Sequence, residues 1–598
     1  MNVDLLVSRG QLVAMALVVA TILQLSNCGG GDGEASSDIA ASSLSARADT
    51  NSALLLAQAR QPGAFAEGAA WGAAPSSALS RNPEAWLPAM REAGISSVRN
   101  FRAPPEDDRL GPILAAGMSA VGILQWSPRT PVSLPVDDLE GWRNYVTTEV
   151  RRHQGRVKYW EIWNEPPNFT QDKSPASYAK VVATAYDAAK AVDPGVQLGL
   201  AAKSNHLNFL AETIDAGAAD KFDFITLHPY EIAELLTQGW EGQFMSIVPR
   251  VRRMLMARNP ARAHVPVWFT EIGISAAAPP GRGRVGPLGQ ADGLVKIYSM
   301  AFAQGVPRVY WFDPRDSEGL SMGLTTGDGA KRPAWHAMRS MSTYIGQRPG
   351  YVGWLQPGNA WYGFVFNGPR GVVLSAWARP GQSSQLSLAS EVLQVDPRSG
   401  TTTATRTPAI TDVPVLLVAP AGSALAQQWL GEAAANAGSA FRWNGDHSRS
   451  ASVQLTAGAP PDGIFMVKPP PVTEVDGRAE YNVQGSIGAC FAVDPTFFSY
   501  AYAAAPLHIT ARVRGHGAGD PGFELKYESG ATIAATDGNN LKGVGSGWFR
   551  ITGTEVLEKT WQLPDARFVG LYGYNFCFYA PDPVKNSGFS IRQVAVRR

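Results

Sequence analysis

Short apolar segments alternate with longer amphipathic segments between residues 62 and 346. The longer segments repeat apolar residues at the spacing of a helix face, as in residues 139–150, where Asp137 and Asp138 are candidate N-caps. The short segments predict eight strands, near residues 69–72, 97–101, 119–124, 157–163, 196–200, 222–227, 265–269 and 308–312. Eight strands alternating with helices are typical of a (β/α)8 TIM barrel, an α/β fold. A doubly wound open sheet shares this alternation, but the count of eight favours the barrel.

After residue 347 the pattern changes to alternating apolar and polar residues, the period of a strand with one polar face. Residues 347–420 contain several short strands separated by turn residues and predict a small β-sandwich. An Ala- and Gly-rich stretch, residues 421–439, is expected to be a linker. Residues 440–598 alternate again, as over residues 507–514, and predict a C-terminal all-β sandwich domain.

Residues 1–28 have the pattern of an export signal. Arg9 precedes an uncharged, mostly apolar stretch at residues 12–25, and Cys28 stands just beyond it. The ending resembles a bacterial lipobox, in which Cys28 would be lipidated and become the new N-terminus. Plain secretion and an uncleaved membrane anchor are the alternatives. Residues 29–61 are expected to be a flexible linker. The chain is therefore expected in the periplasm or outer membrane as a lipoprotein, or otherwise secreted.

Charge and cysteine content exclude two classes of function. The chain has 52 Lys and Arg against 51 Asp and Glu, which argues against nucleic-acid binding through bulk charge. No Cys/His cluster has the spacing of zinc ligands, so a structural zinc site is not expected. Cys490 and Cys577 both fall in the last domain, where they either form a disulfide or remain two buried free thiols.

Two glutamates end predicted barrel strands. Glu165 ends the fourth strand and Glu271 the seventh. Because strands four and seven lie on opposing sides of an eight-stranded ring, the two carboxylates can face one another across the barrel mouth. Facing carboxylates are the minimal equipment for hydrolysis of a glycosidic bond, one as acid and the other as nucleophile or base.

The segment Trp163-Asn164-Glu165-Pro166 resembles the acid/base motif of glycoside hydrolase clan A, and Thr270-Glu271 resembles its strand-seven nucleophile. Residues 323–337 and the small β-sandwich are similar to family 39, which includes β-xylosidases, α-L-iduronidases and bacterial exopolysaccharide endoglycosidases. The resemblance extends over roughly residues 62–420. It implies a retaining mechanism with Glu165 as acid/base and Glu271 as nucleophile, and it implies no metal or organic cofactor.

The resemblance also implies substrate-site roles for residues at other strand ends: Arg99 beside the nucleophile, keeping it ionised, Asn164 beside the acid/base, His228 and Tyr230 on strand six, and Trp311 under the bound sugar. Trp126 is either a sugar platform or part of the core. Glu161 is interpreted as serving barrel packing or ion pairing. Burial near a second carboxylate is expected to raise the pKa of Glu165.

The leading hypothesis from the sequence is a retaining β-glycosidase, endo-acting on a bacterial exopolysaccharide. The alternatives are an exo-acting, β-xylosidase-like hydrolase and a non-catalytic polysaccharide-binding surface lipoprotein. The expected partner is a polysaccharide or oligosaccharide, with no nucleic acid and with membrane contact only through the N-terminal lipid. Residues 440–598 are either a carbohydrate-binding module or a structural sandwich packed on the barrel.

Overall fold

The computed structural model describes most of the chain from residue 70 onward. The described ranges are residues 70–101, 108–126, 133–168, 172–278, 285–355, 360–437, 447–483, 488–499, 505–516, 520–536, 541–580 and 588–598. Within them, no helix combines the length and the apolar character needed to cross a membrane. The expected export signal, the lipidation site Cys28 and the linker at residues 29–61 lie outside the described residues.

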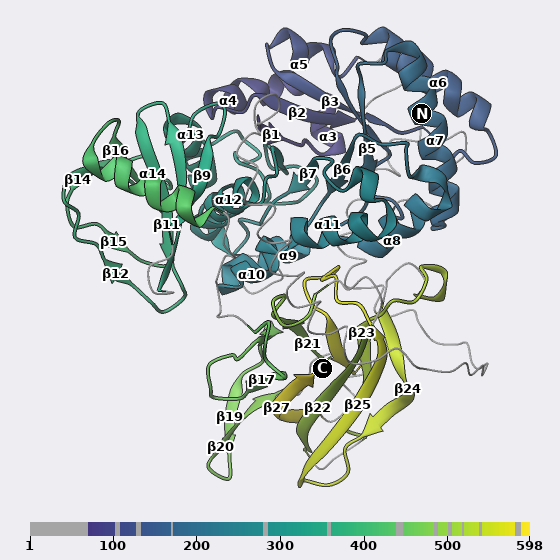
Figure 1. Cartoon of the computed structure of the whole chain (residues 1–598), viewed down its shortest axis with the longest axis vertical. Coiled ribbons are helices and arrows are strands. Elements are labelled where there is room, and N and C mark those ends of the chain that lie inside the picture. Colours follow the sequence, from purple (N-terminus) through teal and green to yellow (C-terminus); the bar gives the residue numbers. More distant parts are fainter. Residues whose placement is uncertain are drawn as a thin grey trace.

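Eight parallel strands follow one another around a closed barrel, with β1 hydrogen-bonded to both β2 and β8 (Figure 1). The predicted (β/α)8 fold is therefore confirmed. The strands are β1 (Ala70–Ala73), β2 (Ser97–Phe101), β3 (Ser119–Leu124), β4 (Tyr159–Ile162), β5 (Gln197–Ala201), β6 (Phe224–Leu227), β7 (Val267–Ile272) and β8 (Arg308–Trp311).

Amphipathic helices surround the barrel and cover it with their apolar faces. In α6 the carboxylate of Asp138 caps the first turn by accepting from the N–H of Gly141, and Trp142, Val146 and Val150 are buried. The α-helices are α3 (Ser77–Ser80), α4 (Leu87–Glu92), α5 (Gly111–Ala115), α6 (Leu139–Arg152), α7 (Pro175–Val192), α8 (Leu207–Thr213), α9 (Tyr230–Leu235), α10 (Glu241–Met245), α11 (Ile247–Arg258), α12 (Gly286–Ala303) and α13 (Pro333–Tyr344). Shorter helical turns are η2 (Pro83–Ala85), η3 (Ile214–Ala218), η4 (Leu236–Gln238) and η5 (Pro260–Arg262).

A small β domain follows α13. One sheet has the order β14-β13-β16-β11-β10-β9, and β12 pairs with β15. The strands are β9 (Tyr351–Leu355), β10 (Trp361–Gly368), β11 (Gly371–Ala378), β12 (Ser384–Gln385), β13 (Val392–Val395), β14 (Thr402–Thr405), β15 (Ala409–Ile410) and β16 (Val415–Pro420). This domain packs beside the barrel, on the left in Figure 1.

The stretch expected to be a linker, residues 421–439, is instead mostly helix α14 (Ala424–Asn436). Its alanines are the best helix formers, and the hydroxyl of Ser423 accepts from the N–H of Ala426 as an N-cap. Trp429 and Ala433 are buried against the small β domain. Composition alone suggested a linker because glycines are interspersed with the alanines of this stretch.

The C-terminal domain is a sandwich of two antiparallel sheets. One has the order β19-β20-β27-β22-β25, with β17 also paired to β27, and the other has the order β18-β21-β26-β23-β24. Alternate residues of both sheets form a separate apolar core. The elements are β17 (Ser452–Thr456), β18 (Ile464–Val467), β19 (Val472–Val475), β20 (Arg478–Asn482), β21 (Gly488–Val493), β22 (Ala505–Gly515), β23 (Gly522–Glu528), η6 (Ala534–Thr536), β24 (Leu541–Arg550), β25 (Val556–Ala566), β26 (Phe576–Tyr579) and β27 (Phe589–Arg597).

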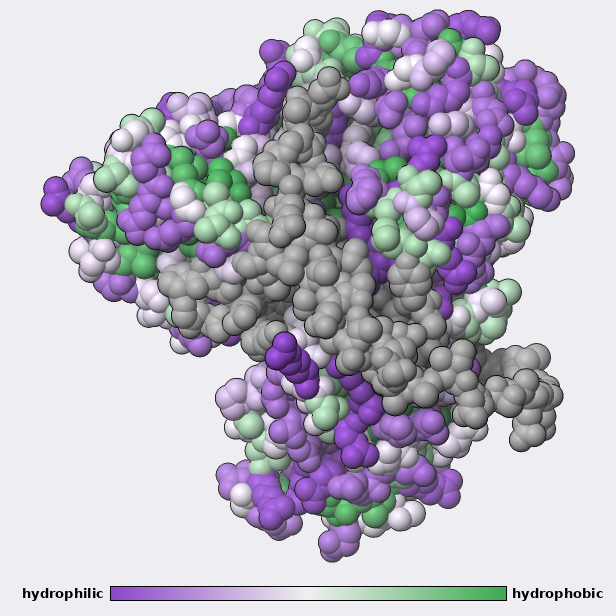
Figure 2. Space-filling model, viewed as in Figure 1, coloured by the Kyte–Doolittle hydropathy of each residue, from purple (hydrophilic) through white to green (hydrophobic). Residues whose placement is uncertain are grey.

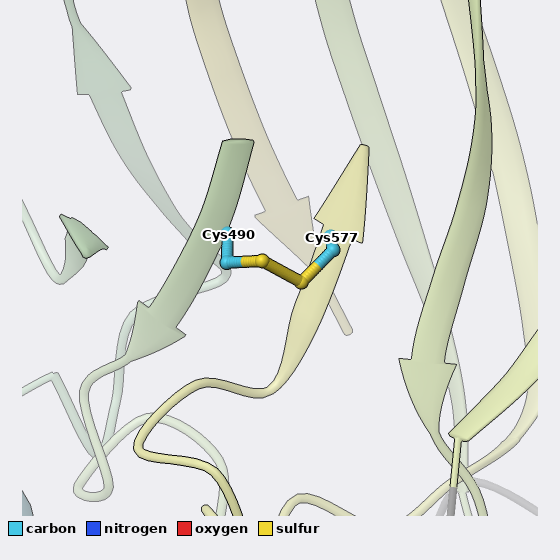
Figure 3. The surroundings of a disulfide bond; sticks show 2 residues. All are labelled: Cys490 and Cys577. Carbon is cyan, nitrogen blue, oxygen red and sulfur yellow. A yellow bond between two sulfur atoms is a disulfide. The ribbon is translucent and has the colours of Figure 1, made fainter. Parts of the chain in front are cut away.

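Cys490 and Cys577 form a disulfide between neighbouring strands (Figure 3). They are paired residues of β21 and β26, with Cα atoms 4.1 Å apart. Of the two states that the sequence left open, the structure contains the bridge.

Loss of this disulfide is expected to lower the free energy of unfolding of the C-terminal domain by about 2–4 kcal/mol. The bridge joins residues 87 positions apart, so its removal returns much conformational entropy to the unfolded chain. Thermal unfolding of the parent and of the double variant Cys490→Ser, Cys577→Ser, each with and without dithiothreitol, measures this. The reductant should lower the parent's Tm toward that of the variant and leave the variant unchanged. Equal Tm values for oxidised parent and variant would contradict the expectation.

The C-terminal domain packs directly on α8 to α11 of the barrel, below it in Figure 1. Arg250 of α11 is buried at this contact and donates to Ser499 Oγ at 2.8 Å and to the carbonyl oxygen of Val569 at 2.9 Å. Trp240 stacks on Phe465 with ring centroids 4.8 Å apart. A buried guanidinium bonded across the contact shows that the domain is docked on the barrel.

The surface of the molecule is largely polar. On the face seen in Figure 2, hydrophilic residues cover most of the coloured surface of the barrel and the C-terminal domain, and hydrophobic residues form small separate patches. Among the described residues, three large hydrophobic side chains are exposed: Met256, Leu288 and Val472. Most apolar residues in the described part of the chain are therefore buried in its cores.

Candidate active site

Polar side chains gather at the rim where β2, β4, β6 and β7 end. Parallel strands of a closed barrel share one carboxyl-end rim, so residues far apart in sequence meet there. They are Arg99 on β2, Glu161 on β4, Asn164 and Glu165 just after β4, His228 and Tyr230 just after β6, and Thr270 and Glu271 on β7.

The two glutamates predicted to be catalytic face each other around His228. The Nδ1 atom of His228 lies 2.7 Å from Glu165 Oε1 and 3.7 Å from Glu271 Oε2. One carboxylate oxygen of Glu165, one of Glu271 and a ring nitrogen of His228 all lie within 4.8 Å of one another. The structure thus brings the fourth-strand and seventh-strand carboxylates into one cluster.

The backbone that carries Glu165 is strained. Trp163 and Glu165 have φ values of 69° and 48°, in the left-handed region that non-glycine residues rarely adopt. The surroundings hold them there: the N–H of Trp163 donates to the carbonyl oxygen of Leu124 at 2.8 Å, and the indole is buried edge-on against Trp142. Such over-determined strain is found at functional sites, and here it aims the Glu165 side chain into the barrel mouth.

Arg99 uses three nitrogens of its guanidinium to hold three partners. Its Nε donates to Glu161, its Nη1 to Glu271 Oε1 at 2.5 Å and its Nη2 to Asn164 Oδ1 at 2.7 Å. The side chain is 1% exposed. Burial would lower the pKa of Arg99, but the charges of Glu161 and Glu271 raise it above its ordinary value. Arg99 is therefore a fixed cation that links the carboxylates of Glu161 and Glu271 with Asn164.

Glu161 is the site residue to which the sequence analysis gave only a packing or pairing role. Its carboxylate is fully buried and accepts hydrogen bonds from Arg99, from Thr226 Oγ1 at 2.5 Å and from Thr270 Oγ1 at 3.0 Å. The signal was present in the sequence, because a lone acid within an apolar barrel strand must find a cation or several donors. Glu161 supplies the counter-charge that fixes Arg99 from below the rim.

Tyr230 and Arg99 hold Glu271 from two sides. The Tyr230 hydroxyl donates to Glu271 Oε2 at 3.0 Å, and Arg99 donates to Oε1. Burial, together with the charges of Glu271 and Glu165, raises the pKa of Tyr230 well above its ordinary value, so the hydroxyl remains a donor. Both oxygens of Glu271 thus have a donor, and the carboxylate has a fixed orientation.

The hydrogen bonds of His228 place a proton on its Nε2 atom and leave one proton shared between its Nδ1 atom and Glu165. Thr270 Oγ1 donates to Glu161, so it can accept from His228 Nε2, which is 3.1 Å away. His228 Nδ1 lies 2.7 Å from Glu165 Oε1, so these two atoms share a proton.

The pKa values of His228 and Glu165 shift in opposite directions. Burial would lower the pKa of His228, but the charge of Glu271 and the hydrogen bond to Glu165 raise it above its ordinary value. Burial would raise the pKa of Glu165, but the hydrogen bond and charge of His228 lower it. The expected raised pKa of Glu165 is therefore wrong for the site without substrate. The sequence did not show the hydrogen bond between His228 and the Glu165 carboxylate.

The His228–Glu165 pair makes stability depend on pH in a defined direction. Because the folded-state pKa of His228 is raised, its contribution is fully present below about pH 6.5, the unfolded value, and is lost as pH rises through the higher folded value. We expect the parent to gain unfolding free energy relative to His228→Gln between pH 8.5 and pH 6.5. Denaturant titrations at both pH values measure this, with His264→Gln, at an exposed loop position, as the control. A parent–variant difference that is equal at the two pH values would contradict the raised pKa of His228.

The aromatic side chain that faces the site after β8 is Phe312, and the predicted role of Trp311 is not supported. Trp311 is 0% exposed and donates from Nε1 to the carbonyl oxygen of Met322 at 3.0 Å. Phe312 instead packs edge-on against Tyr230, with ring centroids 6.1 Å apart. Neighbouring residues of a strand point to opposite sides, so an error of one position moves the aromatic from the site into the core.

Trp126 lies at the rim after β3, half-buried, and stacks on Tyr145 with ring centroids 6.1 Å apart. Tyr145 stacks in turn on Trp142, which contacts Trp163. This row of aromatic rings connects Trp126 to the strained turn before Glu165. Both interpretations of Trp126, as a platform and as part of the core, fit this position.

Glu165, His228 and Glu271 also have the spacing of a three-residue metal site. The hydrogen bonds already described use these atoms for other contacts, because His228 Nδ1 and Glu165 share a proton and Arg99 supplies a positive charge at Glu271. A histidine must offer a lone pair to bind a metal. The donor set of this cluster therefore suits proton transfer better than metal binding.

The sequence matches no known family model and no curated protein. The structure is similar to solved structures of glycosidases. One is a family 39 glycoside hydrolase from the gut symbiont Bacteroides cellulosilyticus WH2, with 17% identity, a TM-score of 0.46, and coverage of 58% of this chain and 80% of that chain. Another is a family 39 β-xylosidase from Caulobacter crescentus, with 17% identity, a TM-score of 0.39, and coverage of 59% and 97%. A glucosidase from Croceicoccus marinus has 11% identity and a TM-score of 0.41, with coverage of 89% and 96%. At these identities the similarity concerns the fold alone.

Proposed function

We propose that the chain is a retaining glycoside hydrolase that cleaves β-glycosidic bonds, with Glu271 as nucleophile and Glu165 as acid/base. The observation that carries this proposal is the unequal environment of the two facing carboxylates. Glu165 shares a proton with His228, whereas Glu271 is held by Arg99 and Tyr230. A carboxyl group that can pass on a shared proton and a second carboxyl group oriented for attack are the equipment that glycosidic hydrolysis requires.

The separation of the two groups favours retention over inversion. An oxygen of Glu165 and an oxygen of Glu271 lie within 4.8 Å of each other. Retaining enzymes have carboxyl groups about 5–5.5 Å apart, whereas inverting enzymes need about 6.5–9.5 Å to place a water between them. The gap here suits direct attack by a carboxylate on the sugar.

In the first step, an oxygen of Glu271 bonds to the anomeric carbon while the bond to the glycosidic oxygen breaks. The proton shared by His228 and Glu165 passes to that oxygen through Glu165, so the leaving sugar departs as an alcohol. In the second step, Glu165 takes a proton from water, whose oxygen displaces Glu271 from the anomeric carbon. The proton returns to the His228–Glu165 pair and the site is regenerated.

For the substrate, we propose endo action on a bacterial exopolysaccharide by an exported chain lipidated at Cys28. The N-terminal pattern and the family 39 resemblance of the sequence support this choice. Arg99, Asn164, His228, Tyr230 and Phe312 surround the proposed catalytic pair and are the proposed sugar contacts. Exo action on short oligosaccharides is the second candidate, because family 39, which residues 323–337 resemble, also includes β-xylosidases.

Product analysis tests the stereochemistry and the mode of cleavage. Proton NMR of the first products should show the β anomer before mutarotation, and an initial α anomer would contradict retention. Endo action predicts oligosaccharides of many lengths from the first minutes of the reaction. Release of monosaccharide alone would instead support the exo candidate.

A further inference from the structure

We propose that residues 569–575 of the C-terminal domain, here called the tyrosine loop, form one wall of the substrate cleft. There, the stacked pair Tyr572 and Tyr574 packs against a sugar ring of the bound polysaccharide, on the leaving-group side of the cleaved bond. This inference rests on the proposed hydrolase function and adds to it a subsite built by a second domain.

The tyrosine loop is connected to the acid/base side of the site through the turn after β5. Pro166 follows Glu165 directly, and its carbonyl oxygen accepts from the N–H of Lys203 at 3.0 Å. The ammonium group of Lys203 lies over the ring of Tyr572, 5.9 Å from its centroid. One backbone hydrogen bond and one side-chain contact therefore separate Tyr572 from the residue next to Glu165.

A second path connects the loop to the nucleophile side. Tyr230, which donates to Glu271, is followed by Glu231. A Cβ atom placed on Gly573 would lie 2.7 Å from the carbonyl oxygen of Glu231, and Gly573 has a φ of 76°. Only glycine allows this close approach and this conformation, so the loop lies directly on the backbone beside Tyr230.

The loop is also bonded to the barrel rim and packed on its core. Asn205, in the turn after β5, donates from Nδ2 to the carbonyl oxygen of Val569 at 2.8 Å. Val569 and Leu571 belong to the apolar core of the barrel, and Tyr572 packs against that core. The wall is thus continuous with the barrel.

A buried carboxylate fixes the shape of the loop. Glu528, at the end of β23, accepts from the N–H groups of Val569, Gly570 and Leu571 at 2.7, 2.8 and 2.7 Å. It also accepts from Asn575 Nδ2 at 2.9 Å. Because both ends of the loop bind one carboxylate, the tyrosines are held before a substrate arrives, and ordering them costs little on binding.

The two rings present the type of surface that sugars bind. Tyr572 and Tyr574 are both half-buried and stack on each other, with centroids 5.9 Å apart and an interplanar angle of 30°. Tyrosine combines a flat apolar face with a hydroxyl group, which suits the C–H face and the hydroxyls of a pyranose.

Barrel order assigns this subsite to the leaving group. The tyrosine loop lies over the ends of β5 and β6, across the closed barrel from β1 and β2, whereas Arg99 is on β2 and Phe312 follows β8. The sugar that becomes bonded to Glu271 lies toward Arg99 and Phe312. The sugar that departs with the proton from Glu165 extends toward β5 and meets the tyrosine loop.

The test uses the full chain and compares two kinds of substrate that differ only in the leaving group. Xylotetraose, cellotetraose and laminaritetraose carry leaving sugars, whereas the corresponding β-glycosyl fluorides leave a single atom. For Tyr572→Ala and Tyr574→Ala, we expect the ratio of kcat/KM on the cleaved tetrasaccharide to that on its fluoride to fall about tenfold, which corresponds to about 1.4 kcal/mol. Tyr572→Phe and Tyr574→Phe keep the ring and should retain the ratio within about twofold. Tyr481→Ala, a tyrosine of β20 in the same domain, is the matched control.

An unchanged ratio in both alanine variants would overturn the subsite. Tm values separate a damaged domain contact from a lost platform, because a purely structural role would lower Tm and both kcat/KM values together. The affinity of Glu271→Gln for the same tetrasaccharides, measured by calorimetry, provides a second arm without turnover. If the parent hydrolyses neither type of substrate, the proposed function fails for these three sugar linkages, and the calorimetry with the same tetrasaccharides still tests the loop. Binding weakened about tenfold by Tyr572→Ala supports the loop and unchanged binding overturns it.

Discussion

Replacing Glu271 with glutamine is expected to lower kcat by at least about 10⁴-fold, because no other group in the cluster can form the bond to the anomeric carbon. Glutamine keeps the shape of the side chain and its acceptor for Arg99, so the fold should persist. The measurement is single-turnover and steady-state hydrolysis of the best substrate, with circular dichroism as the check on folding. A loss smaller than about tenfold would contradict the nucleophile role.

Azide separates the roles of the two glutamates. In Glu271→Ala, azide can enter from the vacated side and give a glycosyl azide of inverted configuration from an activated fluoride. In Glu165→Ala, the sugar first bonds to Glu271, and azide then displaces it to give the retained configuration. The same configuration from both variants would contradict the assignment of nucleophile and acid/base.

Replacing Arg99 with methionine is expected to lower the free energy of unfolding by about 3–5 kcal/mol and kcat/KM by about 10²–10³-fold. The guanidinium is the cation that Glu161 and Glu271 share, so its removal leaves two buried carboxylates without their partner. The stability loss is measured by denaturant unfolding and the activity loss with the same substrate as above.

Two further variants make the Arg99 result specific. Arg143→Met removes an arginine from the exposed pair with Glu140 on α6, and we expect it to cost no more than about 1 kcal/mol. Arg99→Lys keeps the charge but cannot reach Glu161, Glu271 and Asn164 with one planar group, so it should lie between parent and Arg99→Met. Equal effects of Arg99→Met and Arg143→Met would contradict the proposed network.

The barrel could be predicted because its strands and its helices each have a recognisable pattern of apolar residues in the sequence. Apolar strands and amphipathic helices alternate eight times, and that count left few architectures. The pair Glu165 and Glu271 followed from their places at strand ends, since closure of the barrel forces those ends together. Helix α14 was missed because alanine-rich composition does not by itself distinguish a helix from a linker.

The parts of the site that could not be predicted depend on side-chain pairing in space. The hydrogen bond from His228 to Glu165 reverses the direction of the pKa shift expected from burial alone. Phe312 replaces Trp311 because one position of strand register decides which ring faces the site. The docking of the C-terminal domain rests on single residues such as Arg250 and Gly573, and neither carries a periodic signal.

Release of reducing ends tests the central claim most directly. The parent, Glu165→Gln and Glu271→Gln would be incubated with a panel of polysaccharides that includes the producing organism's own secreted matrix. We predict that new reducing ends appear with the parent and fall to background with both variants. If all three proteins bind polysaccharide equally and none releases reducing ends, the hydrolase is contradicted, and a polysaccharide-binding surface protein takes its place.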